Sequence, residues 1–187
     1  MRFVENNRQT LLGELRELLA DADDALFAVA YVRSSGIRLS RRSLEHLRER
    51  QGRLRVLLTL RPPISDAAAI RTLIDLGAHV RCYDASHVFH IKTYIVRNRD
   101  RTFAIVGSAN LSGSALTLAR EWCLRGDNEQ LPIDEMRAEF ERLWSSSYAA
   151  DVTENTSDGS KRRPCPLSWR QSSYARTRLQ LLVVGGL

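Results

Sequence analysis

Short apolar runs alternate with segments of helical periodicity through the first half of the chain, and this alternation is the strongest constraint on its fold. Leucines at helical spacing predict an amphipathic first helix, and the nearly continuous apolar run ALFAVAYV then predicts a buried strand. Strands that are joined by helices of about ten residues favour right-handed crossovers and parallel pairing. The expected strands are Ala25–Val32, Leu54–Leu60 and Ala78–Tyr83, and the expected helices are Thr10–Leu19, Ser40–Glu49 and Ala67–Leu76. We therefore expect an α/β fold with a mixed, largely parallel β-sheet flanked by helices.

Two further apolar strands follow, His90–Val96 and Thr102–Val106, joined by a short charged turn that is typical of a hairpin. A polar loop then opens a helix that we expect to contain Glu121, and Asp134–Tyr148 predicts the last helix of the domain. Together these elements predict one domain over residues 1–150.

The composition changes after residue 150, which indicates a separate tail over residues 151–187. Asp151–Pro166 is rich in Ser, Thr, Asn and Pro and predicts a flexible linker. Leu179–Val184 is apolar again, and it is compatible with an extra strand, with the start of a missing downstream domain, or with disorder. The tail has six basic and three acidic residues, and so carries half of the net charge of +6.

The net charge of +6 and the isoelectric point of about 9.7 favour polyanionic partners such as nucleic acid or anionic lipid. Three cysteines without metal-ligand spacing fit a reducing compartment better than a disulfide scaffold. The N-terminus lacks the apolar core of a signal peptide, and no apolar run approaches the length that spans a membrane. We expect a cytoplasmic protein without stable membrane association.

His90 and Lys92 are the first candidates for chemistry, because residues two apart on a strand point to the same face. A lone histidine is more often a strand residue satisfied by a backbone carbonyl. A lysine on the same face favours a different interpretation, since a buried ammonium is costly unless it meets an anion. Ser108 and Asn110 follow the next strand and can donate hydrogen bonds to phosphate oxygens, while Gly107 permits close backbone approach.

Glu121 is a candidate to orient the imidazole and stabilise its charged form, as the third member of a catalytic triad does. A solvated glutamate paired with Arg120 or Arg125 is an equally good interpretation of the residue alone.

These residues together resemble the phospholipase D superfamily, whose signature is His-x-Lys followed by Gly-Ser/Gly-x-Asn. The matching segments are His90-Ile91-Lys92 and Gly107-Ser108-Ala109-Asn110, and Glu121 stands where similar bacterial endonucleases of the family carry a glutamate. The family motif also has an aspartate five residues after the lysine, where this chain has Arg97. Many nuclease-like members are similar in lacking that aspartate, so the departure weakens a lipase interpretation more than a phosphodiesterase one.

The resemblance implies a phospholipase D-like fold and a phosphodiester hydrolase in which His90 forms a phosphohistidine intermediate. Lys92, Ser108 and Asn110 would neutralise charge on the phosphoryl group, and no metal or other cofactor is implied. Because the chain has a single His-x-Lys pair, a second half-site must come from another subunit, and the simplest solution is a homodimer with the site at its interface.

The expected substrate is nucleic acid, and DNA more than RNA. Several arginines fall near predicted loops and the hairpin and could contact a phosphate backbone, which favours nucleic acid over lipid. These are Arg33, Arg38, Arg41, Arg42, Arg97, Arg99 and Arg101. A solvated basic surface is the alternative explanation of the arginines. For the whole chain, the alternatives are a phospholipase-type enzyme acting on lipid and an inactive module for nucleic-acid binding or dimerisation. Similar domains are fused to helicase or restriction modules, so such a module is a possible partner in a longer architecture.

Overall fold

The apolar runs of the sequence form the centre of a mixed β-sheet in the computed structural model, which describes residues 1–59, 65–85, 88–153 and 165–166. The described elements, in chain order, are β1 (Arg2–Val4), α1 (Leu11–Leu19), β2 (Asp24–Val29), α2 (Ser34–Glu49), β3 (Arg53–Leu58), α3 (Ala67–Asp75), β4 (His79–Tyr83), β5 (Lys92–Asn98), β6 (Arg101–Gly107), α4 (Gly113–Thr117), β7 (Cys123–Asp127), α5 (Ile133–Trp144), β8 (Ala149–Thr153) and β9 (Cys165–Pro166).

The strands are arranged in the order β1-β7-β6-β5-β2-β3-β4-β8-β9. The mixed α/β fold is confirmed, but its parallel part is smaller than expected. Among the described strands, three neighbouring pairs are parallel (β2 with β3, β3 with β4, β8 with β9) and five are antiparallel. The first two parallel pairs are those whose strands are connected by α2 and α3, as parallel pairing requires a long crossover.

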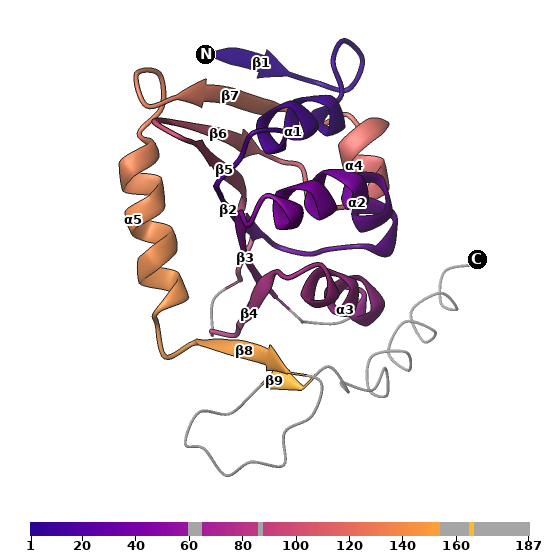
Figure 1. The fold of residues 1–187 in the computed structure, drawn as a ribbon, viewed down its shortest axis with the longest axis vertical. Coiled ribbons are helices and arrows are strands. Elements are labelled where there is room, and N and C mark those ends of the chain that lie inside the picture. The colour runs from indigo at the N-terminus through magenta and orange to yellow at the C-terminus, as the bar shows by residue number, and fades with distance from the viewer. Residues whose placement is uncertain (60–64, 86–87, 154–164, 167–187) are drawn as a thin grey trace, which may run out of the picture.

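Helices cover both faces of the sheet, as Figure 1 shows, with α1, α2, α3 and α4 on one face and α5 on the other. Each face has its own apolar cluster. Phe27, Val56 and Tyr94 lie in the cluster under α1 to α4, and Leu26, Leu57 and Ile95 lie in the cluster under α5. Neighbouring positions on each strand therefore face different clusters, which is the period-two pattern of a sheet buried on both sides.

Four of the described strands were not expected from the sequence, and the last of them, β9, pairs with β8. β1 and β7 pair with each other at one edge, and β8 extends the other edge beside β4. In β7 the inward position is Arg125, whose guanidinium binds Glu14 and Glu17 of α1. A buried ion-paired arginine removes the apolar alternation by which a strand is recognised.

Several expected boundaries also differ from the structure. Helix α2 begins at Ser34 rather than Ser40, and the expected domain boundary at residue 150 falls inside β8. Asp151–Thr153 and Cys165–Pro166 are strand residues, so the two ends of Asp151–Pro166 are not part of a flexible linker. The apolar segment Leu179–Val184 lies outside the described residues. Among the helices that are described, none is long and apolar enough to cross a membrane.

Candidate active site

His90 and Lys92 lie where the chain enters β5. This is the end of the sheet at which the carboxyl ends of β2, β3 and β4 lie. The Lys92 Nζ atom is 2.7 Å from Nδ1 of His90 and 2.8 Å from its backbone oxygen. The imidazole is exposed, whereas Lys92 is only 6% exposed. His90 precedes the strand by two residues rather than forming part of it, but the two side chains meet as expected.

The polar loop comes to the same place because β6 runs antiparallel to β5. Thr93 pairs with Val106, so Lys92 lies beside Gly107 and the loop that follows. Asn110 is buried, and its Oδ1 accepts a hydrogen bond of 3.1 Å from the backbone N–H of Tyr31. This bond fixes the side chain and leaves its amide NH₂ as a donor.

Ser108 and Glu121 are directly bonded, since the Ser108 hydroxyl donates to Oε2 of Glu121. The backbone N–H of Trp122 donates to Ser108 Oγ over 3.1 Å, which fixes the pair at the end of β6. The expectation that Glu121 lies in a helix is wrong, because α4 ends at Thr117 and Glu121 lies in the segment before β7. Its carboxylate contacts the serine, and the described contacts include none between Glu121 and the His90 ring.

Burial lowers the pKa of the Lys92 ammonium from its ordinary value, and the negative charge of Glu121 acts in the opposite direction and raises it. A partly desolvated cation with a nearby carboxylate is a suitable group to neutralise a phosphate.

Tyr94 is a positioning residue that the sequence reasoning missed. It is fully buried beneath the site, and its hydroxyl donates to the backbone oxygen of Ala109 over 3.1 Å. The available signal was strand periodicity, because Tyr94 is two residues after Lys92 and shares its face.

Helix α2 holds the loop from the other side. The backbone N–H of Arg33 donates to Leu111 over 2.9 Å, and that of Gly113 donates to Ser35 Oγ over 3.0 Å. A Cβ on Gly36 would lie 2.3 Å from the Leu111 oxygen, so the close contact between helix and loop depends on this glycine.

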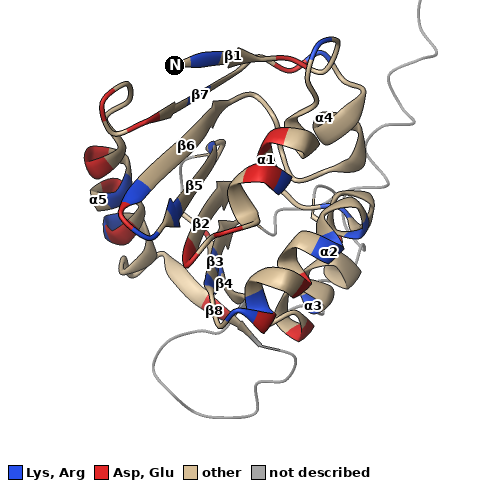
Figure 2. Ribbon diagram, turned by 45° about the horizontal axis from the view of Figure 1, so that its top comes forward, with Lys and Arg blue, Asp and Glu red and all other residues tan. Residues whose placement is uncertain are grey.

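The arginines that were expected to contact a phosphate backbone do not form a single surface. Figure 2 shows basic residues spread over separate elements. Arg97, Arg99 and Arg101 lie around the β5–β6 turn, at the far end of both strands from His90. Five residues of strand separate Arg97 from Lys92, or about 16 Å. These three arginines therefore lie away from the site. One of them is Arg97, which occupies the position of the family's aspartate.

Arg33, unlike Arg97, Arg99 and Arg101, lies at this end of the sheet. Its guanidinium is 2.8 Å from Asp66 and lies over the ring of Tyr31, 5.8 Å from the ring centroid. An arginine already engaged in this way would contribute to anion binding mainly through long-range attraction.

The part of the chain that the structure describes contains no group of three or more His, Cys, Asp or Glu side chains that could hold a metal ion. The candidate site instead consists of an imidazole, an ammonium, a hydroxyl, an amide and one carboxylate. This set can supply a nucleophile and donors for phosphate oxygens.

Comparison with known proteins identifies the class. The family described as "Cardiolipin synthase, PLD-like domain" matches residues 15–144, so the chain belongs to this phospholipase D-like family. No curated protein matches the sequence.

Solved structures share the fold at low sequence identity. Nuc from Salmonella typhimurium, a phospholipase D family member, has a TM-score of 0.67 at 15% identity, covering 82% of this chain and 97% of its own. NucT from Helicobacter pylori has a TM-score of 0.62 at 14% identity, covering 78% and 95% respectively. Phosphatidylserine synthase from Haemophilus influenzae has a TM-score of 0.55 at 15% identity, covering 80% of this chain and 39% of its own. The expected family and fold are confirmed, and they support a phosphodiester hydrolase.

Gly107→Ala tests whether the geometry at the end of β6 is required. A Cβ at this position would lie 2.2 Å from the Trp122 oxygen and 2.6 Å from Cys123 Sγ, so β6 and β7 must separate. We expect a loss of about 1–3 kcal/mol of unfolding free energy, the usual effect of overpacking, together with loss of activity as Ser108 moves. Chemical denaturation measures the first effect.

Gly13→Ala is the control, because its Cβ would approach only Thr10 Oγ1 at 3.4 Å. Unchanged stability of the Gly107 variant would contradict the prediction.

Proposed function

We propose that the protein is a metal-independent endonuclease that hydrolyses DNA phosphodiesters through a phosphohistidine at His90 and acts as a homodimer. The observation that carries this proposal is the contact of 2.7 Å between the exposed His90 ring and the buried Lys92 ammonium, beside Ser108 and Asn110. A site that holds a nucleophile next to a buried cation, an amide donor and a serine hydroxyl suits attack on an anionic phosphorus centre.

Lys92 donates to His90 Nδ1, so that atom acts as an acceptor. When a substrate phosphate draws the ammonium to its oxygens, Nδ1 can carry the ring proton and Nε2 presents its lone pair. A bond then forms between Nε2 and phosphorus as the bond to the leaving oxygen breaks, and a second histidine protonates that oxygen. Water, deprotonated by the second histidine, next displaces His90 from phosphorus and releases the product.

The second histidine comes from a partner chain in this proposal, since the sequence has a single His-x-Lys pair. An exposed apolar patch next to the site suits such a contact. It consists of Phe3, Trp122 and Leu124, which are 53%, 72% and 37% exposed, and the first two rings touch edge to face at 5.9 Å. Exposed aromatic side chains beside a functional site are typical of interfaces.

Subunit mixing tests the shared site. Random exchange of wild-type chains with an equal amount of His90→Ala chains should lower the activity per wild-type chain to about half, because hybrid dimers lack one histidine. Trp122→Asp should shift the protein to monomers in analytical ultracentrifugation and abolish activity with them. Activity per wild-type chain that is independent of the added variant would contradict a shared site.

Glu121→Gln tests the charge balance around Lys92, whose ammonium must stay protonated to neutralise the phosphate. The Glu121 carboxylate raises the pKa of Lys92, so its removal should let that pKa fall further below its ordinary value. The alkaline limb of the kcat/KM profile for bis-p-nitrophenyl phosphate should therefore move to lower pH. Glu129→Gln, an exposed site in the β7–α5 connection, is the control, and a limb that stays in place or moves to higher pH would contradict the assignment.

The substrate class is tested by incubating the protein in EDTA with plasmid DNA, RNA, phospholipid vesicles and bis-p-nitrophenyl phosphate. Cleavage of the plasmid and the small diester, without release of lipid headgroups, supports the nuclease proposal. Headgroup release alone would favour the lipid alternative. Failure on every substrate, together with retained DNA binding, would favour an inactive binding module.

A further inference from the structure

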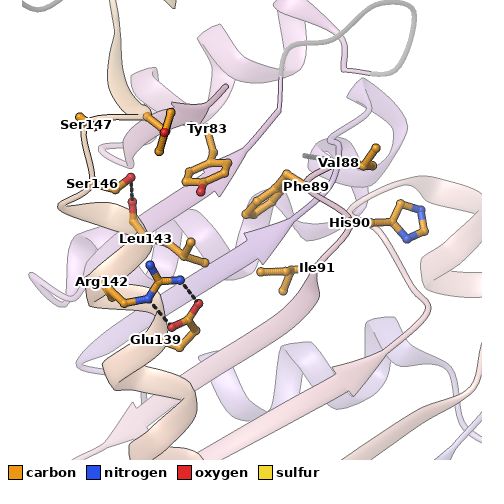
Figure 3. A pocket seen from close by; sticks show the side chains of 11 residues that line it. Tyr83, Val88, Phe89, His90, Ile91, Glu139, Arg142, Leu143, Ser146 and Ser147 are labelled. Carbon is orange, nitrogen blue, oxygen red and sulfur yellow. Dashed lines mark hydrogen bonds and ion pairs between the residues drawn. The ribbon is translucent and has the colours of Figure 1, made fainter. Parts of the chain in front are cut away.

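A cavity lies beside the segment that contains His90. It has a volume of about 590 Å³, within the usual range of ligand sites. Its walls come from the end of β4, from residues 88–91 and from the last turns of α5 with the segment after it. His90 is itself a lining residue, but Figure 3 shows its ring pointing away from the aromatic rings of the cavity, and Lys92, Ser108 and Asn110 are not among the lining residues.

The cavity is lined by aromatic rings. The ring centroids of Tyr83 and Phe89 are 5.4 Å apart, and those of Tyr83 and Tyr148 are 6.1 Å apart. Tyr148 is 53% exposed, so this ring is available to a ligand at the rim. Flat aromatic walls favour a flat ring between or against them.

Tyr83 also places a hydroxyl group at the cavity. The residue is only 8% exposed, yet its hydroxyl forms no hydrogen bond with any residue that the structure describes. In Figure 3 the hydroxyl points toward the space between Phe89 and Leu143. The hydroxyl is not one of the described buried side-chain atoms that lack a hydrogen-bond partner, so it is open to the cavity and can form a hydrogen bond with the polar edge of a ligand.

The rim is charged rather than apolar. Arg142 and Glu139 form a two-point ion pair of 2.7 and 2.6 Å at the mouth of the cavity. A charged rim and an inner hydroxyl suit a heteroaromatic ring with hydrogen-bonding edges better than they suit an acyl chain, which offers neither.

The cavity and the candidate nucleophile are adjacent along the chain. Phe89 forms part of the wall and His90 is the next residue, so their Cα atoms are about 3.8 Å apart. A nucleic-acid strand whose phosphate meets the His90 ring can therefore direct a neighbouring base over the same segment.

We propose that this cavity binds one unpaired nucleobase of the substrate strand, next to the scissile phosphate. The base would stack on Tyr148 and Phe89 and share a hydrogen bond with Tyr83. This inference rests on the proposed nuclease function and adds a preference for single-stranded or frayed DNA, because a paired base cannot enter.

The test uses the His90→Ala protein, which cannot cleave, and single-stranded hexathymidylates that carry one 2-aminopurine at each position in turn. The fluorescence of this base falls when it stacks. We expect strong quenching at one position only. Tyr148→Ala should weaken binding of that oligonucleotide about tenfold through lost stacking, and Tyr83→Phe severalfold through the lost hydroxyl. Leu118→Ala is the control for removal of an exposed apolar side chain (82% exposed) outside the cavity.

Equal quenching at every position, or unchanged binding in both tyrosine variants, would overturn the inference. Hydrolysis of bis-p-nitrophenyl phosphate by the wild-type protein in EDTA is measured together with the fluorescence and binding experiments. If that hydrolysis occurs without position-specific quenching, only the base site is wrong. If hydrolysis and oligonucleotide binding are both absent, the proposed function and the base site are wrong together.

Discussion

His90→Ala is expected to lower hydrolysis of plasmid DNA and of bis-p-nitrophenyl phosphate by on the order of 10⁴-fold or more, because the variant has no atom that can form the covalent intermediate. The ring is exposed and its described contacts are with Lys92, so its removal should leave the fold intact. The measurement is kcat/KM in EDTA, with the melting temperature recorded beside it.

The matched control is His46→Ala, which removes a half-exposed imidazole from α2, away from the site. This control should retain wild-type activity. If His90→Ala kept activity within about tenfold of the wild type, His90 could not be the nucleophile, since loss of a covalent nucleophile costs far more.

Lys92→Met is expected to lower kcat by about 10²–10³-fold, the usual effect of removing one preorganised donor to a charged transition state. Methionine keeps the length of the apolar stem, so the substitution removes little but the ammonium. The residue is 6% exposed, and burial already lowers the pKa of its ammonium. An apolar side chain should therefore be tolerated there, and the melting temperature should stay constant or rise.

These two effects in opposite directions separate a chemical role from a structural one. A variant that lost activity and unfolded at a lower temperature would indicate that Lys92 supports the fold. Arg42→Met, on the exposed side of α2, is the control for loss of a positive charge and should leave kcat for the small diester unchanged.

The sequence was sufficient to predict the parts of the molecule that depend on local periodicity. Strand β2 is a nearly continuous apolar run, β3 and β4 are short segments rich in apolar residues, and each strand is followed by a helix or loop that the turn residues mark. The meeting of His90, Lys92 and the Ser108–Asn110 loop also followed from the sequence, because two strands joined by a short turn must bring their outer ends together. One further signal was available, since only two of the 28 Lys and Arg residues are lysine and one of these is Lys92.

The position of Glu121 and the grouping of the arginines depended on tertiary structure. The helix of the polar loop is short, ending at Thr117, and the next residues lead to the start of β7, where the backbone N–H of Trp122 donates to Ser108. Arg97 is near Lys92 in sequence, but a strand is an extended element that separates its two ends. Strand β7 was not predicted for a related reason, because its inward residue is an arginine paired with glutamates of a distant helix.

The most direct test of the proposed chemistry is detection of the covalent intermediate. The protein is mixed with excess bis-p-nitrophenyl phosphate in EDTA, quenched within one turnover, kept at alkaline pH to preserve the phosphorus–nitrogen bond, and digested for peptide mass spectrometry. We predict a p-nitrophenyl phosphoryl adduct on the peptide that contains His90, with fragment ions that assign it to the His90 ring, and no adduct in His90→Ala. Hydrolysis that proceeds in EDTA with no adduct, or with an adduct on another residue, would contradict the assignment of His90 as the nucleophile.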